Sequence, residues 1–226
     1  MELIMSNTNF TSGNKISSNK HFEEKPVYDF FKRALDIVCS LLAIILFSWL
    51  FIILFAVIRL TSKGPAIFVH KRVGKNGKEI GVYKFRSMVM NAEEMIKNFT
   101  PEQKAEFEKN FKLENDPRIT KVGKFIRKTS LDELPQLFNI LKGDLSIVGP
   151  RPITEAETEF FGNYKDLLLS VKPGLTGFWA ASGRSNVAYS RRRAMEIYYV
   201  KNRSFLLDIK IIFKTVLSVF KSEGAV

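Results

Sequence analysis

The sequence predicts an α+β protein that is mainly α-helical with a small β-hairpin. It also predicts a membrane anchor made of one N-terminal apolar helix together with interfacial amphipathic helices. Three observations support this fold class. Residues 37–58 form an uncharged, apolar run of 22 residues. Two short runs of β-forming residues flank Asn76-Gly77. Helix-capping patterns open several of the remaining segments.

Length, charge and the rare residue types limit the possible classes of function. The chain has 226 residues, which suits one domain or one domain with an appendage. Its 35 Lys and Arg outnumber its 23 Asp and Glu, for a formal net charge of +12. This balance favours an anionic partner such as nucleic acid, a phosphorylated metabolite or lipid headgroups. Because Cys39 is the only cysteine and His21 and His70 are the only histidines, we expect no disulfide framework, no thiolate or histidine zinc site and no Ser-His-Asp triad.

The chain divides into three parts. Residues 1–26 are rich in Ser, Asn, Thr and Lys, which predicts a disordered tail. Residues 27–63 contain the membrane-inserted helix, because the uncharged run rises about 33 Å as a helix and so can cross a hydrocarbon core. This run begins too late and is too long for a signal peptide. Residues 64–226 form a domain on the cytoplasmic face of the membrane.

Basic residues flank the apolar run on both sides, with Lys32 and Arg33 before it and Arg59 and Lys63 after it. Basic residues on both flanks are consistent with a re-entrant helix that enters and leaves on the cytoplasmic side. A straight span is the alternative, and it places only the short tail outside. No proline follows Ser48 within the run, and a serine hydroxyl bends a helix only weakly. Both geometries therefore remain open from the sequence.

The segments after the apolar run predict a hairpin and a series of helices. Gly64-Pro65 breaks the chain, and residues 66–73 and 80–85 predict two strands joined by an Asn76-Gly77 turn. Helices are expected at 91–98, from a capping box at Thr100 to about residue 111, at 119–128, from Thr154, from Arg191 and at 205–220.

The last of these helices has an amphipathic pattern. Lys210, Lys214 and Lys221 form one cationic stripe on an otherwise apolar helix. This pattern is typical of a helix that lies in a membrane interface. The alternative is a core helix with one solvated edge.

Residues 129–137 contain the pattern with the most chemical content. Ser130 followed by Glu133 and an apolar run is a capping box, which predicts a helix that begins at Ser130 and ends at Gly143. Asp132 and Glu133 then fall in the first turn, where unpaired N–H groups and the helix dipole attract anions. Two carboxylates at such a place suit a divalent cation, or a nucleophile with an assisting group. The alternative is that both residues only stabilise the helix end.

Several basic residues are candidates for binding an anion near this acidic pair. Arg127 lies five residues before Asp132, and Arg151 is held between two prolines and is suited to gripping phosphate. Lys84 and Arg86 share one face of the second strand, although a solvated pair of cations is the alternative. Arg184 follows a glycine and suits a phosphate or a sugar, with a structural turn as the alternative.

These motifs, in this order, resemble the bacterial sugar transferase family, the membrane-embedded phosphoglycosyl transferases that act on polyprenol phosphate. The resemblance runs from about Tyr28 to Ala225. Its elements are Lys32-Arg33 with Asp36, Gly64-Pro65, Arg72 with Gly74, Tyr83-Lys84-Phe85-Arg86-Ser87-Met88, residues 130–137, Leu141-Lys142-Gly143-Asp144, Gly149-Pro150-Arg151-Pro152, residues 173–177, Ser182-Gly183-Arg184 and Leu207-Asp208-Ile209-Lys210.

The resemblance implies an enzyme that transfers a sugar 1-phosphate from a UDP-sugar to undecaprenyl phosphate. It implies that residues 64–226 are the catalytic domain, at the cytoplasmic face of the bacterial inner membrane, and that the product initiates synthesis of exopolysaccharide, capsule or another surface glycan. Membrane lipids and polysaccharide-assembly proteins are then expected partners, and nucleic acid is not. The sugar stays open between galactose, glucose and N-acetylated or deoxyamino sugars.

The resemblance also implies roles for individual residues. Asp132 is the expected nucleophile, which forms an aspartyl-phosphosugar and expels UMP. Glu133 is expected to hold Mg²⁺ together with Asp132 or to assist proton transfer. Phosphate and substrate binding is expected from Arg127, Arg151, Lys84, Arg86 and Arg184. Two alternatives to an enzyme are a membrane-tethered binding module with a basic surface and a scaffold subunit of a polysaccharide-assembly complex.

Overall fold

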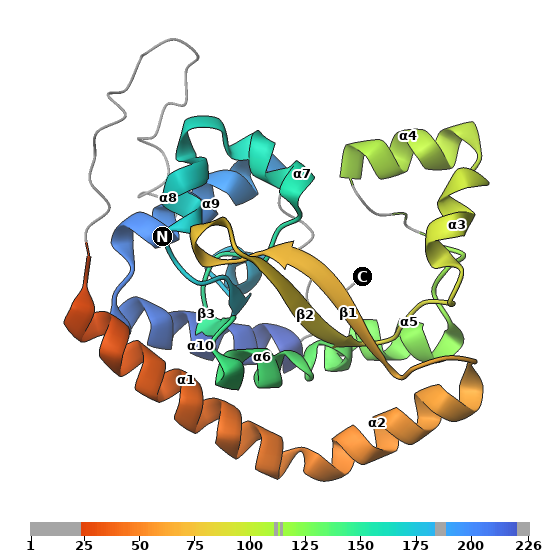
Figure 1. Cartoon of the computed structure of the whole chain (residues 1–226), viewed down its shortest axis with the longest axis horizontal. Helices are drawn as coiled ribbons and strands as arrows, with labels where there is room; N and C mark the ends of the chain where they lie inside the picture. The colour runs from red at the N-terminus through yellow and green to blue at the C-terminus, as the bar shows by residue number, and fades with distance from the viewer. Residues whose placement is uncertain (1–23, 111–112, 114, 184–188, 221–226) are drawn as a thin grey trace.

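The computed structural model describes residues 24–110, 113, 115–183 and 189–220. Nearly all of the predicted tail of residues 1–26, as well as Arg184 and Lys221, lies outside the described residues. The described chain is mostly helical and has two small two-stranded sheets (Figure 1). The predicted combination of a mainly helical fold with a β-hairpin is confirmed, and the second sheet was not predicted.

The elements follow one another in a simple order. They are α1 (Pro26–Leu46), α2 (Ser48–Thr61), β1 (Ile67–Val73), η2 (Lys75–Gly77), β2 (Glu79–Phe85), α3 (Ala92–Lys97), α4 (Pro101–Asn110), α5 (Lys121–Lys128), η3 (Leu131–Glu133), α6 (Gln136–Lys142), β3 (Ser146–Val148), α7 (Glu155–Thr158), η4 (Glu159–Tyr164), α8 (Lys165–Leu169), β4 (Gly174–Thr176), η5 (Ala180–Ser182), α9 (Tyr189–Asn202) and α10 (Phe205–Phe220), where η marks a 3₁₀-helix.

The apolar run is a bent pair of helices rather than the single helix expected from the sequence. The chain bends by 63° between α1 and α2. At the bend, the Ser48 hydroxyl donates a hydrogen bond to the Ile45 carbonyl at 2.9 Å, a contact of the kind that bends helices. Among the described residues no single helix has the length and apolarity needed to cross a membrane, whereas α1 and α2 taken together do.

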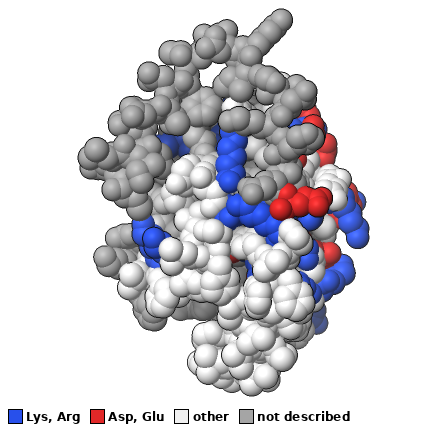
Figure 2. Space-filling model, turned by 90° about the vertical axis from the view of Figure 1, so that its left-hand side faces the viewer, with Lys and Arg blue, Asp and Glu red and all other residues white. Residues whose placement is uncertain are grey.

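Large apolar side chains remain exposed along both helices of this pair. Leu42 is 61% exposed, Ile52 71% and Leu60 86%. Figure 2 shows that the lower part of one face, where Figure 1 places α1, is almost free of charged side chains, whereas Lys, Arg, Asp and Glu gather above it. α10 contributes further exposed apolar side chains, among them Phe213 and Leu217. An uncovered apolar surface of this extent marks a contact surface.

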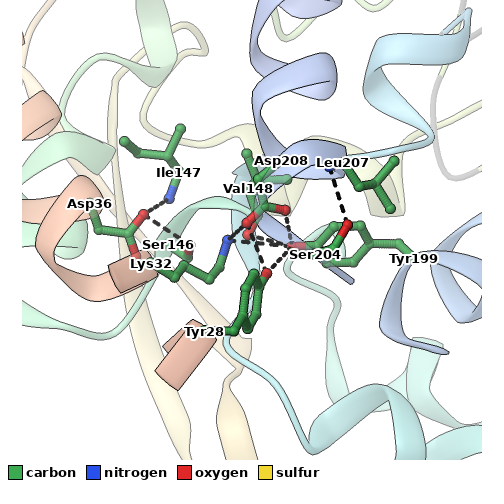
Figure 3. A network of polar contacts seen from close by, with 10 residues as sticks. All are labelled: Tyr28, Lys32, Asp36, Ser146, Ile147, Val148, Tyr199, Ser204, Leu207 and Asp208. Carbon is green, nitrogen blue, oxygen red and sulfur yellow. Dashed lines mark hydrogen bonds and ion pairs between the residues drawn. The ribbon is translucent and has the colours of Figure 1, made fainter. Parts of the chain in front are cut away.

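Two buried aspartates fasten α1 to the rest of the molecule (Figure 3). Asp208, at the start of α10, accepts hydrogen bonds from Lys32 at 2.7 Å and from the hydroxyls of Tyr28 and Tyr199 at 2.8 Å each. Asp36, on α1, accepts hydrogen bonds from the Ser146 hydroxyl and the Ile147 amide of β3. Because buried charges need partners, these contacts define where α1 lies against β3 and α10.

The hairpin is antiparallel and in the predicted place. Ile67 pairs with Phe85 and Val73 with Glu79. Asn76, in the connecting turn, adopts a φ of 58°, a left-handed conformation that asparagine tolerates better than most residues. The unpredicted second sheet is parallel, with β3 beside β4.

The hydrophobic core places the hairpin against the predicted acidic stretch. Ile80 and Val82 of β2 pack in one cluster with Leu137 and Ile140 of α6. The Asn139 side chain adds polar contacts, because it accepts from the Tyr83 amide and donates to the Gly81 carbonyl. β2 and α6, the helix that follows the acidic pair, therefore lie side by side.

Candidate active site

The acidic pair lies in a 3₁₀ turn, so the predicted α-helix start at Ser130 is wrong. Ser130 has a φ of 57°, its side chain makes no capping bond, and α6 begins only at Gln136. The reason is Pro135, which lacks the N–H that an α-helix needs to bond the Leu131 carbonyl. The Leu134 amide donates to that carbonyl instead, at 3.3 Å. The predicted end of the helix is confirmed, because Gly143 caps α6 with a φ of 96°.

The two carboxylates have different surroundings. Asp132 is buried, with 8% of its surface exposed. Glu133 is more accessible and accepts a hydrogen bond from the Lys84 ammonium at 2.7 Å. Burial and, to a lesser extent, the charge of Glu133 raise the pKa of Asp132 to about 6, although Lys84 and Arg127 act to lower it. An aspartate with a pKa near neutrality beside cations is typical of a functional group.

Lys84 lies on β2, whereas Arg86 comes just after the strand ends, and the two cations have separate roles. The Arg86 guanidinium donates to the carbonyls of Ser62 and Lys63 and to the Ser62 hydroxyl. These groups lie just beyond the C-terminal end of α2, where a positive charge is stabilised by the helix dipole. Arg86 therefore contacts the end of the apolar helix pair, and Lys84 is the cation of β2 that contacts the acidic pair.

Arg127 and Arg151 come from different elements and line the same cleft as the acidic pair. Arg127 occupies the last turn of α5, immediately before the segment that carries Asp132. Arg151 follows β3, and its guanidinium lies 5.6 Å from the centre of the Trp179 ring. Both arginines line one cleft of about 1950 Å³, together with Asp132, Glu133 and Lys84. The structure thus brings all five described residues that we assigned to the site besides Asp132 to one cleft, although the Arg86 guanidinium donates its hydrogen bonds to groups just beyond α2.

The cleft contains further cations that the sequence analysis did not assign to it. Arg72 on β1 pairs with Glu157 at 3.0 Å and contacts the His70 ring nitrogen at 3.2 Å. Arg192 on α9 lies over the Trp179 ring at 4.7 Å. His70 and Arg72 belong to the same hairpin face as Lys84, because directly paired residues of an antiparallel hairpin point to one side. Extending the predicted strand alternation across the hairpin would have identified them.

His70 is neutral at physiological pH. Burial and the neighbouring Arg72, Lys84 and Arg151 lower its pKa to about 4. A neutral imidazole nitrogen without a proton accepts a hydrogen bond. The ring therefore adds no charge to the cleft, and it helps to orient the Arg72 guanidinium.

This arrangement of charges suits a ligand that carries several phosphates. Cations from β1, β2, α5, α9 and the loop after β3 face one cleft. A buried aspartate with a pKa of about 6 is largely ionised at neutral pH and is available for nucleophilic attack. Such a site can bind an activated phosphate compound and stabilise negative charge as a phosphorus–oxygen bond breaks.

Comparison with known proteins identifies relatives of the chain. The model of a family described as bacterial sugar transferase matches residues 27–222. Undecaprenyl-phosphate galactose phosphotransferase of Salmonella typhimurium is 53% identical over 199 residues, which cover 87% of this chain and 42% of the relative. UDP-glucose:undecaprenyl-phosphate glucose-1-phosphate transferase of Klebsiella pneumoniae is 40% identical over 207 residues, or 86% of this chain and 41% of the relative.

A third relative has a length similar to that of the chain. Exopolysaccharide production protein ExoY of Rhizobium meliloti is 40% identical over 204 residues, which cover 89% of this chain and 90% of the relative. The chain spans less than half the length of the Salmonella and Klebsiella proteins. The similarity to those two proteins therefore concerns the part of each relative that holds this domain.

Proposed function

Because the chain belongs to the bacterial sugar transferase family, we propose that it transfers a sugar 1-phosphate from a UDP-sugar to undecaprenyl phosphate. The Salmonella and Klebsiella relatives are named for this acceptor, with galactose and glucose respectively as the sugar. ExoY is named for exopolysaccharide production. We propose that the product of this chain likewise begins an exopolysaccharide, a capsule or another surface glycan.

The observation that best supports this proposal is the environment of Asp132. Its carboxylate is buried in a cleft lined with cations, and its pKa of about 6 leaves it ionised at neutral pH. In the proposed first step, an Asp132 oxygen attacks the β-phosphorus of the donor. The bond between that phosphorus and the bridging oxygen breaks, and UMP leaves with the electron pair. Lys84 and Arg127 oppose the negative charge that develops on the phosphate oxygens.

The second proposed step returns the aspartate to its starting state. A phosphate oxygen of undecaprenyl phosphate attacks the phosphorus of the aspartyl-phosphosugar, and the Asp132 carboxylate leaves. The products are the undecaprenyl diphosphate sugar and free enzyme. A covalent intermediate allows a water-soluble donor and a membrane-bound acceptor to occupy the cleft at different times.

Asp132 and Glu133 would hold a magnesium ion, because both carboxylates line the cleft proposed for the donor. No group of three or more His, Cys, Asp or Glu gathers among the described residues, so side chains alone do not form a metal cage in this part of the chain. Mg²⁺ is commonly held by one or two carboxylates together with substrate phosphates. When bound, the ion withdraws charge from the phosphate oxygens.

The bent helix pair is proposed to hold the enzyme in the bacterial inner membrane. The cleft extends to Ala43, Phe47 and Leu50, the residues around the bend between α1 and α2. An acceptor whose tail lies among these apolar residues can bring its phosphate toward Asp132. We propose that the bent pair enters and leaves on the cytoplasmic side, where UDP-sugars are available. Membrane lipids and polysaccharide-assembly proteins are then the partners, and nucleic acid is not.

Release of UMP tests this function. Membranes that contain the chain are incubated with Mg²⁺, undecaprenyl phosphate and a panel of UDP-sugars. We expect UMP from at least one donor, and a loss of about 10³-fold or more in the Asp132→Asn variant, because the nucleophile is removed. Asp166→Asn changes an exposed aspartate on α8 and serves as the matched control with an unchanged rate. An unchanged rate in Asp132→Asn excludes Asp132 as the nucleophile.

A covalent label tests the proposed intermediate directly. Wild-type protein is mixed with a donor that carries ³²P in the β-phosphate, without the lipid acceptor, and is then denatured. Label is expected on wild type and not on Asp132→Asn. Glycolipid formation without any label on the protein argues for direct transfer.

A further inference from the structure

A small side chamber lies next to the acidic pair and is distinct from the open cleft. Its volume is about 30 Å³, which is room for one small polar group. The residues that line it include Glu133, Lys84, Trp179 and Glu196. Because Glu133, Lys84, Arg151 and Trp179 line both the chamber and the cleft, a ligand in the cleft can extend a substituent into the chamber.

Glu196 offers an unused hydrogen-bond acceptor at this chamber. It lies on α9 and is only 2% exposed. Its Oε1 accepts a hydrogen bond from the Arg151 amide at 3.2 Å. Its Oε2 is buried and has no hydrogen-bond partner among the described residues. A Cβ at Gly177, which also lines the chamber, would lie 3.9 Å from Oε2. A buried carboxylate oxygen without a partner costs free energy, so a ligand group that donates a hydrogen bond to this oxygen would be stabilised here.

Trp179 offers the complementary group. Its indole nitrogen is buried, and within the described part of the chain it has no acceptor. The chamber thus presents one acceptor, from Glu196, and one donor, from Trp179. A hydroxyl group both donates and accepts hydrogen bonds, so one hydroxyl can satisfy both atoms. A methyl group satisfies neither of them.

Close contacts support the chamber walls. The Trp179 ring is contacted by the guanidinium groups of Arg151 and Arg192, at 5.6 and 4.7 Å from its centre. Behind the chamber, the backbones of Gly149 and Gly174 touch so closely that a Cβ at Gly174 would lie 2.1 Å from the Gly149 nitrogen. Neither wall can move far without breaking these contacts, and rigid support is what makes a binding site selective.

We propose that Glu196 accepts a hydrogen bond from one hydroxyl of the sugar nucleotide donor in this chamber and is a specificity-determining residue. This inference rests on the proposed function. The hydroxyl belongs to the transferred sugar or to the ribose, both of which adjoin the diphosphate. A site built to bond a hydroxyl strongly rejects a donor that lacks it, because its buried polar groups are left without partners.

The charge state of Glu196 agrees with this role. Burial raises the pKa of Glu196 to about 7, whereas Arg192, the Arg151 amide and the Arg151 charge act to lower it. A hydroxyl that donates to the carboxylate stabilises the ionised form. Donor binding is therefore expected to lower this pKa and to release a fraction of a proton near neutral pH.

A cycle that removes each partner in turn tests the proposed contact. UMP release is measured for wild type and Glu196→Gln, with the preferred UDP-sugar and with analogues that each lack one hydroxyl of the hexose or of the ribose. Glutamine keeps an oxygen for the Arg151 amide and replaces the second oxygen by an N–H₂ donor. We expect wild type to lose about 10- to 100-fold in kcat/KM when one particular hydroxyl is absent. Glu196→Gln should lose a similar factor with the intact donor and no more when that hydroxyl is also absent.

The controls separate this inference from the proposed function and from misfolding. Glu155→Gln removes an exposed carboxylate of α7 and should leave donor selectivity unchanged. Glu196→Asp keeps the charge but has a shorter side chain, so its carboxylate no longer reaches the hydroxyl. If Glu196→Gln folds poorly, Glu196→Asp replaces it, and it too should lose activity with the intact donor and no more when that hydroxyl is absent. Equal losses in wild type and both variants for every analogue overturn the role of Glu196 while the transferase activity stands. If wild type releases no UMP from any UDP-sugar, the proposed function fails and this inference fails with it.

Discussion

Asp132 is expected to lower the stability of the folded protein, and Asp132→Asn should therefore stabilise the fold while removing its activity. The ordinary pKa of an aspartate is 3.8, and in the folded chain burial raises the pKa of Asp132 to about 6. As the pH rises through this interval, the unfolded chain loses its proton first, so stability is lost between pH 3.8 and about 6 and is constant above. Because one pKa unit corresponds to about 1.4 kcal/mol, the full loss is about 3 kcal/mol. Asparagine does not ionise and avoids this loss.

The measurement is thermal unfolding of detergent-solubilised wild type and Asp132→Asn at pH 5 and at pH 7.5. At pH 5 only part of the loss has developed, and the same linkage relation gives a difference of about 1.6 kcal/mol. At pH 7.5 the difference reaches about 3 kcal/mol, which corresponds to a rise in Tm of about 6–12 °C for a chain of this length. The pH dependence is the diagnostic part, because loss of a hydrogen bond or a packing defect does not grow with pH in this way.

A second buried aspartate provides the matched control. Asp208 is 1% exposed, similar in burial to Asp132, but it pairs with Lys32 at 2.7 Å. Asp208→Asn leaves the partly buried Lys32 ammonium without its charged partner, and removing one partner of a fully buried pair costs about 3–5 kcal/mol as an upper bound. The two substitutions make the same chemical change and are expected to move Tm in opposite directions. If Asp132→Asn destabilises the protein at pH 7.5 as Asp208→Asn does, the reasoning about Asp132 is wrong.

Three further predictions concern the cleft. The kcat/KM for UMP release should fall as the pH drops below a midpoint near 6, because Asp132 must be ionised in the free enzyme to attack. Glu133→Gln should move that midpoint to lower pH, because the charge of Glu133 raises the pKa of Asp132. A midpoint that stays fixed in this variant contradicts the coupling between the two carboxylates. Lys84→Met should lower kcat/KM by about 10- to 100-fold and move the midpoint to higher pH, because the charge of Lys84 lowers the pKa of Asp132. An unchanged midpoint shows that Lys84 does not act on the ionisation of Asp132. His70→Gln should keep kcat/KM within about threefold, because an amide oxygen can accept the Arg72 hydrogen bond as the neutral imidazole does, and a larger loss in a steady-state assay shows that the ring has another role.

The capping patterns show how far local sequence rules reach in this protein. Thr154 and Glu157 form the predicted capping box, with both reciprocal hydrogen bonds present, and so do Thr100 and Gln103. The same pattern at Ser130 does not form one. The difference is a proline five residues after the supposed cap, at the position where the first α-helical bond to the Leu131 carbonyl is required. A local pattern is reliable only when the residues of the next turn permit the helix it predicts.

The rest of the site depends on contacts between distant segments. Arg72, Trp179 and Glu196 meet at one chamber although more than 100 residues separate the first from the other two. Each of them stands in a locally ordinary setting, in a strand, a turn and a helix. Periodicity and capping patterns do not predict that these three residues lie together, because their proximity depends on how β1, α9 and the loop after β4 pack. The acidic pair and Lys84, by contrast, were identifiable from residues 130–137 and from strand alternation.

Two arginines, Arg86 and Arg33, link the apolar helices to the elements around the acidic pair. Arg86, which comes two residues after Lys84 in the chain, donates a hydrogen bond to the Ser62 carbonyl just beyond the end of α2. Lys84 itself contacts Glu133. Arg33 of α1 donates to the carbonyls of Ile140 and Leu141 at the C-terminal end of α6, the helix that follows the acidic pair. Each apolar helix is thus linked to the acidic segment through one arginine and one short rigid element. If α1 and α2 lie in the membrane as proposed, these two links set the depth of Asp132 relative to the lipid surface. Loss of either arginine should then impair use of the lipid acceptor more than binding of the soluble donor.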